Sequence, residues 1–243
     1  MKPMVMKWTG QMRLLLVLGI VAALVACAGH TDRRDQRHVP PRRDGALIDG
    51  IDVSSHQGDI DWAKVTANDD LRFAYVKATE GATYRSPHYQ SNVRQAQRHG
   101  LLVGSYHYLS TTSTISEQYA NFVGAMSTVT QDLIPMIDVE DRGTWSRSQL
   151  IDSLALLAGM LERHYKRRPM IYSTMDFYNQ NLSPQFNRYP LYIGRYSSAK
   201  PAISWDGDYT IWQFTEDGIM AGINVYVDMA RFHPDHDLPE LLL

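Results

Sequence analysis

Short runs of apolar and β-branched residues recur from Ile48 to the end of the chain. Each run is bounded by turn-forming residues such as glycine, proline, asparagine or aspartate, which is typical of β-strands. The runs predict eight strands, at residues 50–54, 73–77, 102–108, 134–140, 170–173, 191–196, 210–214 and 226–230. Between the first several runs, apolar residues recur at the spacing of an amphipathic helix. This spacing predicts five helices, at residues 61–67, 88–99, 116–128, 147–166 and 175–181.

Strands that alternate with helices favour a mainly parallel sheet with helices on its faces. Eight such strands predict an α/β fold in which the sheet closes into a TIM-like barrel. No long helical pattern separates the last three strands, so we expect an irregular barrel. The chain shows no internal repeat, and residues 48–243 form one predicted domain. In such barrels the reactive groups stand at the carboxyl ends of the strands.

The first 47 residues follow a different pattern. Residues 1–26 join a positively charged start to an apolar run that is short for a membrane span, which predicts a signal peptide. The run ends in Leu-Val-Ala-Cys at Cys27, which resembles a bacterial lipobox, although an ordinary signal peptide or an uncleaved anchor also fits. We expect a lipid on Cys27 to hold the exported chain on a membrane, and Ala28 favours the periplasmic face of the outer membrane. Residues 27–47 are polar and predict a flexible tether.

Composition narrows the function classes. The formal net charge of −2 provides no basic field for binding nucleic acid. A single cysteine excludes an internal disulfide and any cysteine cluster for zinc. The sequence contains no phosphate-binding loop and no Gly-x-Ser-x-Gly elbow, which removes support for phosphoryl or acyl transfer. We expect a monomer that needs no cofactor and no metal.

The most informative stretch is Met-Ile-Asp-Val-Glu-Asp, which starts at Met136. Side chains two positions apart on a strand point to the same face, so Asp138 and Glu140 are expected at the barrel mouth together. Two neighbouring acids repel each other when ionised, which raises one pKa and leaves a proton donor beside a charged partner. Glycoside cleavage needs this pair of states. The spacing alone also fits a strand end with two solvated acids.

Two further acids occupy the first and last predicted strands. Asp52 ends the first strand and Asp228 lies on the last one. The first and last strands of a closed barrel are neighbours. The four carboxylates are therefore expected to line a single acidic groove.

Taken together, these stretches resemble the lysozymes of glycoside hydrolase family 25. The resemblance covers nearly the whole predicted domain, and its motifs occur in the family's order. These motifs are Gly-Ile-Asp-Val-Ser-Ser-His-Gln-Gly at 50–58, Val-Lys-Ala-Thr-Glu-Gly at 76–81, Asp-Val-Glu at 138–140, Ile-Trp-Gln-Phe at 211–214, and the closing stretch from Gly222 to Asp228. The closing motif departs from the family at Val225 and Ala230, where glycine and asparagine are usual, which leaves subsite detail near Asp228 open.

The resemblance implies hydrolysis of the β-1,4 bond between N-acetylmuramic acid and N-acetylglucosamine in peptidoglycan, without a cofactor. It implies that Glu140 is the general acid and that Asp138 steers and stabilises the substrate's own 2-acetamido group. Asp52 and Asp228 then position substrate or tune that pair. Such substrate-assisted catalysis retains the anomeric configuration. The identity of the attacking group stays open.

Aromatic residues on the later strands are candidates for sugar stacking, although packing in the barrel core explains each of them equally well. The candidate substrate-binding residues are Tyr106, Tyr108, Tyr172, Tyr196 and Trp212. Gln213 points opposite to Trp212 on a regular strand, so at most one of the two faces the groove.

Other polar residues have simpler interpretations. Lys77 and Glu80 are expected to form an ion pair at the groove rim. His56 and His107 suggest a zinc site, but no metal-binding spacing accompanies them, and a lone histidine is more often a hydrogen-bonded structural group.

Two alternative functions remain. A chitinase-like glycosidase also ends a strand in Asp-x-Glu, but it carries further acids upstream, where Ile134 and Met136 stand here. A wall-binding lipoprotein that does not cut peptidoglycan has no need of a proton donor such as Glu140.

Overall fold

The computed structural model describes residues 38–243. Residues Val39–Leu243 form one compact unit. The predicted signal peptide, the predicted lipidation site Cys27 and most of the predicted tether lie outside the described residues.

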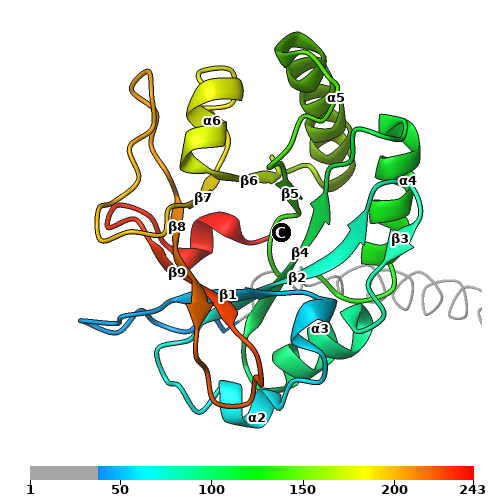
Figure 1. Cartoon of the computed structure of the whole chain (residues 1–243). Coiled ribbons are helices and arrows are strands. Elements are labelled where there is room, and N and C mark those ends of the chain that lie inside the picture. Colours follow the sequence, from blue (N-terminus) through cyan, green and yellow to red (C-terminus); the bar gives the residue numbers. More distant parts are fainter. Residues whose placement is uncertain (1–37) are drawn as a thin grey trace, which may run out of the picture. The chain divides into compact units, whose positions relative to one another are not determined.

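A single nine-stranded sheet organises the described chain (Figure 1). The strands are β1 (Gly50–Val53), β2 (Phe73–Glu80), β3 (Tyr84–Arg85), β4 (Leu102–Tyr108), β5 (Met136–Asp138), β6 (Met170–Thr174), β7 (Leu191–Gly194), β8 (Ile211–Gly218) and β9 (Val227–Phe232). Eight of them close into a barrel, because β1 pairs with both β2 and β9, and β3 only extends the edge of β2. The predicted irregular α/β barrel is confirmed.

The irregularity lies mainly in β9. The barrel strands other than β9 are parallel to one another where they pair, whereas β9 is antiparallel to both β8 and β1. Residues 219–226 connect β8 to β9, and this connection is too short for the crossover that parallel strands need. The start of β9 therefore lies at the barrel end where the parallel strands finish. Asp228 reaches that end although it is the second residue of its strand.

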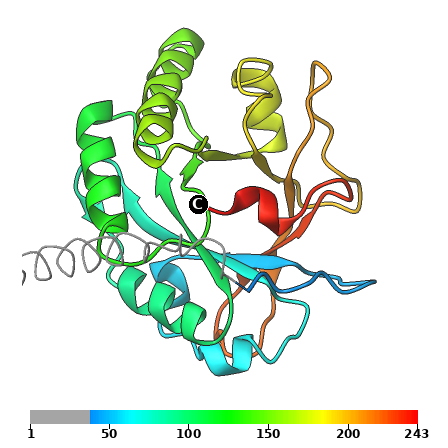
Figure 2. The ribbon, with the colours of Figure 1, turned by 180° about the vertical axis from the view of Figure 1, so that it is seen from behind.

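Five helices lie around the barrel, as predicted. They are α2 (Trp62–Val65), α3 (Tyr89–Arg98), α4 (Ile115–Met126), α5 (Arg147–Tyr165) and α6 (Met175–Asn181), with two short 3-10 turns, η2 (Ser55–Gln57) and η3 (Leu238–Leu241). Ser146 starts α5 with a capping box to Gln149, which satisfies backbone donors at the helix start. Figures 1 and 2 show the helices outside the ring of strands, while long loops flank β8 and β9.

Alternating side chains divide the core into two layers. One layer, which includes Ile137 and Val139, packs between the strands and the outer helices. The other layer fills the barrel interior with residues such as Tyr75, Met136 and Tyr192. Because Ile137 and Val139 face the helices, Asp138 faces inward, as the sequence analysis assumed.

The C-terminal segment closes one end of the barrel. Leu238 and Leu241 of η3 are buried with the interior layer, and the Ile134 N–H donates to the Leu241 carbonyl at 2.8 Å. Figures 1 and 2 both show this red segment inside the ring of strands. The stretch before β1 lies on the same unit, since the Arg72 Nε donates to the Pro40 carbonyl at 2.8 Å. Contacts with the barrel thus begin ahead of Ile48, the predicted start of the domain.

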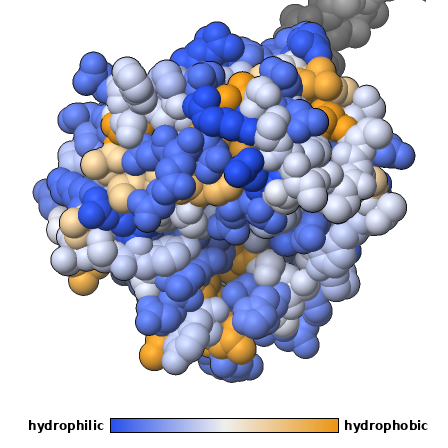
Figure 3. Space-filling view, turned by 45° about the horizontal axis from the view of Figure 1, so that its top comes forward, coloured by the Kyte–Doolittle hydropathy of each residue, from blue (hydrophilic) through white to orange (hydrophobic). Residues whose placement is uncertain are grey.

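The surface in Figure 3 is mostly hydrophilic, with small and separated hydrophobic patches. Within residues 38–243, no helix has the length and apolar character that crossing a membrane requires.

Candidate active site

The four predicted carboxylates meet at the end of the barrel where the parallel strands finish. Asp52 and Asp228 stand directly opposite each other in the β1–β9 ladder, and Asp138 ends β5. All four line a cavity of about 290 Å³. The residues around it are Asp52, Lys77, Tyr106, Tyr108, Met136, Asp138, Glu140, Tyr172, Tyr196, Gln213, Glu216 and Asp228. The predicted acidic groove is therefore present as a physical site.

Asp52 and Asp228 form a coupled pair of acids. Burial raises the pKa of Asp52, while hydrogen bonds from Asp228, Tyr192 and Gln213 lower it in part. Burial also raises the pKa of Asp228, to about 9, and the negative charge of Asp52 adds to that rise. The hydrogen bond between the two carboxyls raises the pKa of Asp228 and lowers the pKa of Asp52. Asp228 therefore holds the proton and donates a hydrogen bond to Asp52.

Asp138 and Glu140 form the second pair. Asp138 is buried, and its Oδ1 has no hydrogen-bond partner among the described residues. Burial, followed by the charge of Glu140, raises the pKa of Asp138 well above its ordinary value. Burial also raises the pKa of Glu140, against an opposing effect of the Tyr172 hydroxyl. Glu140 is nevertheless exposed enough to reach a ligand. The pair therefore keeps a proton more readily than two solvated acids would, and titrates as a unit.

Gln213 joins the two sides of the groove. Its Nε2 donates to Asp52 Oδ2 at 2.9 Å, and its Oε1 accepts hydrogen bonds from the hydroxyls of Tyr172 and Tyr196, each at 2.7 Å. Tyr192 adds a second donor to Asp52 Oδ2, also at 2.7 Å. This network fixes Oδ2 of Asp52 and the rings of two candidate sugar-binding tyrosines.

The structure corrects the assignment of Trp212 to the groove. Trp212 lies on the outer side of β8, where its Nε1 donates to the Arg195 carbonyl at 2.8 Å. Arg231 lies over its ring, 4.7 Å from the centroid. Gln213 takes the inward position instead, because adjacent residues on a strand point to opposite faces. The other four predicted aromatic residues, Tyr106, Tyr108, Tyr172 and Tyr196, line the cavity.

Lys77 is the one cation among the described residues that line the cavity. Its Nζ lies 2.7 Å from Glu80 Oε2, which confirms the predicted ion pair. The same Nζ lies 5.0 Å from the centre of the Tyr108 ring. The positive charge of Lys77 opposes the rise of the Asp138 pKa, so it limits how far the acid pair is neutralised.

The groove continues past the four acids. A second hollow shares Tyr106, Glu216 and Asp228 with the first one. Its other lining residues are Val53, Ser54, His56, Gln57, Asp217 and Tyr226. The two adjoining hollows form one continuous trench. Glu216 was not among the predicted site residues, because β8 extends beyond the predicted 210–214 and carries this acid to the groove.

Gly194 is a further groove residue that the sequence did not single out. A Cβ at this position would stand 3.0 Å from the Tyr172 hydroxyl and 3.2 Å from Gln213 Oε1. Glycine thus leaves room for the hydrogen-bond network of Gln213. No motif or spacing in the sequence signals this requirement.

The histidines weighed for zinc do not share a site. His107 is buried, with Nδ1 2.8 Å from the Thr79 hydroxyl and Nε2 3.0 Å from Gln118 Oε1. Burial lowers its pKa to about 4, so it is a neutral structural group. His56 lies instead in the second hollow of the groove.

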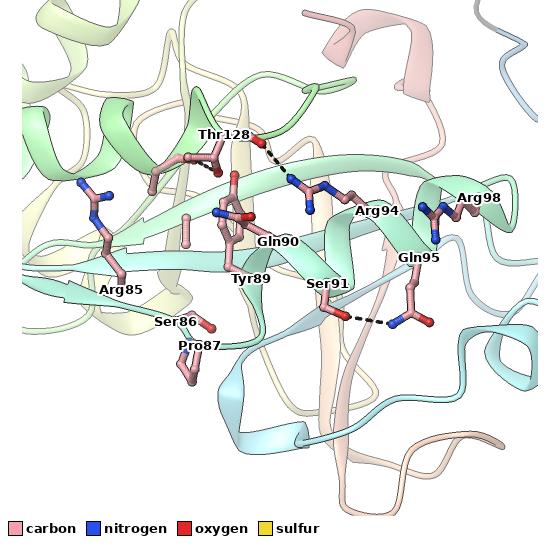
Figure 4. Close-up of a pocket in the computed structure, with 12 residues that line it drawn as sticks. Arg85, Ser86, Pro87, Tyr89, Gln90, Ser91, Arg94, Gln95, Arg98 and Thr128 are labelled. Carbon is pink, nitrogen blue, oxygen red and sulfur yellow. Dashed lines mark hydrogen bonds between the residues drawn. The ribbon is translucent and has the colours of Figure 1, made fainter.

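A larger hollow lies outside the barrel, along α3 and the end of α4 (Figure 4). Its lining includes Arg85, Arg94 and Arg98 and no carboxylate. Figure 4 shows Arg94 bonded to the Thr128 carbonyl, while the guanidinium of Arg85 points away from it. This hollow lacks the acids that glycoside cleavage needs, so the groove is the candidate active site.

Comparison with known proteins agrees with this geometry. Residues 51–223 match the sequence profile of the glycosyl hydrolases family 25. The chain belongs to glycosyl hydrolase family 25. As a family 25 protein it is a glycoside hydrolase. The matched segment contains the groove acids Asp52, Asp138 and Glu140, and Asp228 lies just beyond it.

Relatives of this family 25 chain include the uncharacterized protein YegX of Escherichia coli K12, which is 35% identical over 193 residues, or 76% of this chain and 70% of that protein. The autolytic lysozyme of Clostridium acetobutylicum is 32% identical over 75% of this chain and 55% of its own length. Among solved structures, a family 25 glycosyl hydrolase from Bacillus anthracis matches with a TM-score of 0.71 and 29% identity, over 82% of this chain and 94% of that one.

Proposed function

We propose that the protein is a lysozyme that hydrolyses the β-1,4 bond between N-acetylmuramic acid and N-acetylglucosamine in peptidoglycan. The observation that carries this proposal is the convergence of Glu140 and Asp138 at one end of the barrel, with pKa values raised by burial, in a trench lined by tyrosines. The names of the relatives support it, since they include an autolytic lysozyme and the N,O-diacetylmuramidase of Chalaropsis.

In the proposed reaction Glu140 is the general acid. It gives its proton to the bridging oxygen as the bond between that oxygen and the anomeric carbon breaks, so the leaving sugar departs as an alcohol. The acetamido oxygen of the same substrate bonds to the anomeric carbon, and Asp138 accepts the acetamido N–H and stabilises the positive charge. Water, deprotonated by Glu140, then opens the intermediate, which retains the anomeric configuration.

The other groove residues bind and orient the sugar chain. Tyr106, Tyr108, Tyr172 and Tyr196 offer ring faces and hydroxyls to the substrate. Asp52, held by Tyr192 and Gln213, and protonated Asp228 position the sugar beside the catalytic pair. A trench of two adjoining hollows suits a polymer rather than a single sugar.

Digestion of purified peptidoglycan by the full-length chain tests the proposal. We expect soluble muropeptides with N-acetylmuramic acid at the new reducing end, identified by mass spectrometry after reduction. Glu140→Gln preserves size and removes the proton donor, so kcat is expected to fall by roughly 10²–10⁴. Glu162→Gln on the exposed face of α5 is the matched control and should keep full activity.

Each contrary outcome has a distinct meaning. N-acetylglucosamine at the new reducing end would make the enzyme a glucosaminidase instead of a lysozyme. Binding of peptidoglycan without release of muropeptides would favour a wall-binding lipoprotein. Release from chitin but not from peptidoglycan would favour a chitinase-like enzyme. Full activity of Glu140→Gln would remove Glu140 from the acid role.

We further propose that the enzyme is exported and held on the periplasmic face of the outer membrane by a lipid on Cys27. The lipobox-like sequence that ends at Cys27 supports this. Metabolic labelling with a radioactive fatty acid should label the wild-type chain and not Cys27→Ser. Equal labelling of both chains would refute the lipid anchor, while leaving the glycosidase assignment untouched.

A further inference from the structure

Two histidines and an aspartate come together at the end of the barrel opposite the acid groove. Asp208 precedes β8, His233 follows β9, and His236 lies in the turn that leads to η3. The His233 N–H donates to the Thr210 carbonyl at 2.9 Å, which holds the ends of β9 and β8 together. Each of the three side chains offers one ligand atom, and these atoms lie within 4.8 Å of one another.

We propose that Asp208, His233 and His236 bind a divalent transition-metal ion, with zinc as the best fit. Imidazole nitrogens and a carboxylate oxygen are ordinary zinc ligands, at bond lengths of about 2.0–2.2 Å. Tetrahedral ligands at such bond lengths stand roughly 3.4 Å apart. Small rotations of the partly exposed side chains bring the three atoms to that spacing, with a water or a small anion in the fourth position.

The orientation of His236 favours this assignment. Its Nδ1 lies 2.8 Å from Glu240 Oε2, so the carboxylate accepts the Nδ1 proton and leaves the Nε2 lone pair available. A carboxylate behind a histidine in this way is the usual support of a metal ligand, because it fixes the ring and strengthens the donor nitrogen. This contact is independent of the spacing of the three ligands.

His233 has a carboxylate near each ring nitrogen, although neither is within hydrogen-bond distance. Its Nε2 lies 3.8 Å from Asp208 Oδ1, and the edge-to-face contact with Tyr209 orients its ring. Its Nδ1 accepts the Asp235 N–H at 3.3 Å, a long contact, and lies 3.8 Å from Asp235 Oδ2. Metal binding to Nε2 moves the ring proton to Nδ1, where the Asp235 carboxylate can accept it.

The site is open to solvent and lies beside positive charge. Asp208, His236 and Glu240 line a hollow that also contains Lys166, Arg167, Arg168 and Arg188. These cations weaken the attraction for a metal ion, while Asp208, Asp235 and Glu240 supply compensating negative charge. A small anion in the fourth position would also be favoured by the basic wall.

A metal here would be structural rather than catalytic. It would join the strand ends at Asp208 and His233 to the segment that carries Leu238 and Leu241 into the barrel interior. The expectation that the reaction needs no metal is unaffected, since these ligands lie at the far end of the barrel from the groove acids. The proposal also does not depend on the identity of the substrate.

Zinc titration of the full-length chain, after removal of metals by a chelator, tests the proposal. Calorimetry should show one more bound zinc in the wild-type chain than in the double variant His233→Ala/His236→Ala. This difference excludes zinc bound by other groups, such as Cys27 or the groove acids. His99→Ala, which removes an exposed histidine after α3, is the matched control and should bind like the wild-type chain.

Thermal unfolding gives a second readout. Zinc should raise the Tm of the wild-type chain and of His99→Ala, and should leave the double variant unchanged. Metal-free melting of each chain shows whether it folds. Glu240→Gln keeps a hydrogen-bond acceptor but loses the charge, so zinc affinity should fall about 10- to 100-fold. Equal zinc stoichiometry and an equal Tm rise in the wild-type chain and the double variant would overturn the proposal.

Discussion

Asp49 lies directly before β1, Asp52 is the third residue of that strand, and both are buried. Asp49 faces cations: its Oδ2 lies 3.1 Å from Arg42 Nη2, its Oδ1 lies 3.5 Å from Arg72 Nη1, and it accepts the Phe232 N–H. Asp52 faces another acid, Asp228, directly across the ladder. One carboxylate is thus paired with opposite charge, and the other is confronted with like charge.

The difference separates stability from reactivity within one barrel. A buried carboxylate with two guanidinium partners and a backbone donor stabilises the closed end of the barrel, which the C-terminal segment fills. Acids crowded together in a buried groove keep protons that solvated acids release, and this is unfavourable for folding at neutral pH. Functional sites commonly carry such a cost in stability.

The largest effect is expected from breaking the paired end. Asp49→Ala leaves the buried Arg72 with Asp237, 2.7 Å away, as its remaining carboxylate partner, and it removes the acceptor of the Phe232 N–H. We expect the free energy of unfolding to fall by about 1–3 kcal/mol, measured by urea denaturation, because the Phe232 N–H stays buried without an acceptor. Asp59→Ala removes a fully exposed carboxylate and should change the free energy of unfolding by less than about 0.5 kcal/mol. Equal effects of the two changes would contradict the contrast between Asp49 and Asp52.

A smaller effect of opposite sign is expected at the groove. The pKa of Asp228 rises from 3.8 to about 9 on folding, so between these pH values the folded chain holds a proton that the unfolded chain has released. Stability from this group is therefore complete below pH 3.8 and is lost as the pH rises toward about 9. Asp228→Asn should stabilise the protein by ~1 kcal/mol at pH 8, a figure that allows for solvent screening.

Thermal melts of the wild-type chain and Asp228→Asn at pH 5 and pH 8 measure this difference. The gain in Tm should be greater at the higher pH. Asp152→Asn, which changes an exposed aspartate on α5, should show no such pH-dependent gain. A loss of stability in Asp228→Asn at pH 8 would show that Asp228 is a favourable carboxylate, as Asp49 is.

The last pair of changes distinguishes the groove side of β8 from its outer face. Tyr196→Phe removes the hydroxyl that bonds to Gln213, so kcat/KM on peptidoglycan should fall about five- to tenfold. Trp212→Phe removes the bond to the Arg195 carbonyl on the outer face, so it should cost roughly 1 kcal/mol of stability and leave kcat/KM near that of the wild-type chain. A greater loss of activity in Trp212→Phe than in Tyr196→Phe would show that Trp212 takes part in substrate binding.

Much of the fold was predictable because period-2 and period-3.6 patterns are local properties of the sequence. The strand 102–108 and the helix 175–181 agree with the structure at both ends. The predicted strand 134–140 is shorter, Met136–Asp138, since Pro135 has no N–H to donate to a neighbouring strand. The antiparallel direction of β9 was not predicted, because only the observed extension of β8 to Gly218 makes the connection clearly too short for a crossover.

The candidate site was predictable where it depended on strand spacing and not where it depended on packing. Spacing places Asp138 beside Glu140, and closure of the barrel places Asp52 beside Asp228. No spacing rule decides between Trp212 and Gln213, since one of them must face inward and either fits the pattern. The choice follows from three-dimensional partners, because Asp52 and Tyr172 need the inward amide.

The central claim is that burial and mutual repulsion keep protons on the groove acids. Carbon-13 NMR titration of the side-chain carboxyls measures this directly in the folded chain, with Glu140→Gln and Asp228→Asn used to assign the signals. The account predicts that Asp138 and Glu140 titrate above their ordinary values of 3.8 and 4.5, and that Asp228 titrates near 9. Titration of all three at or below those ordinary values would contradict it.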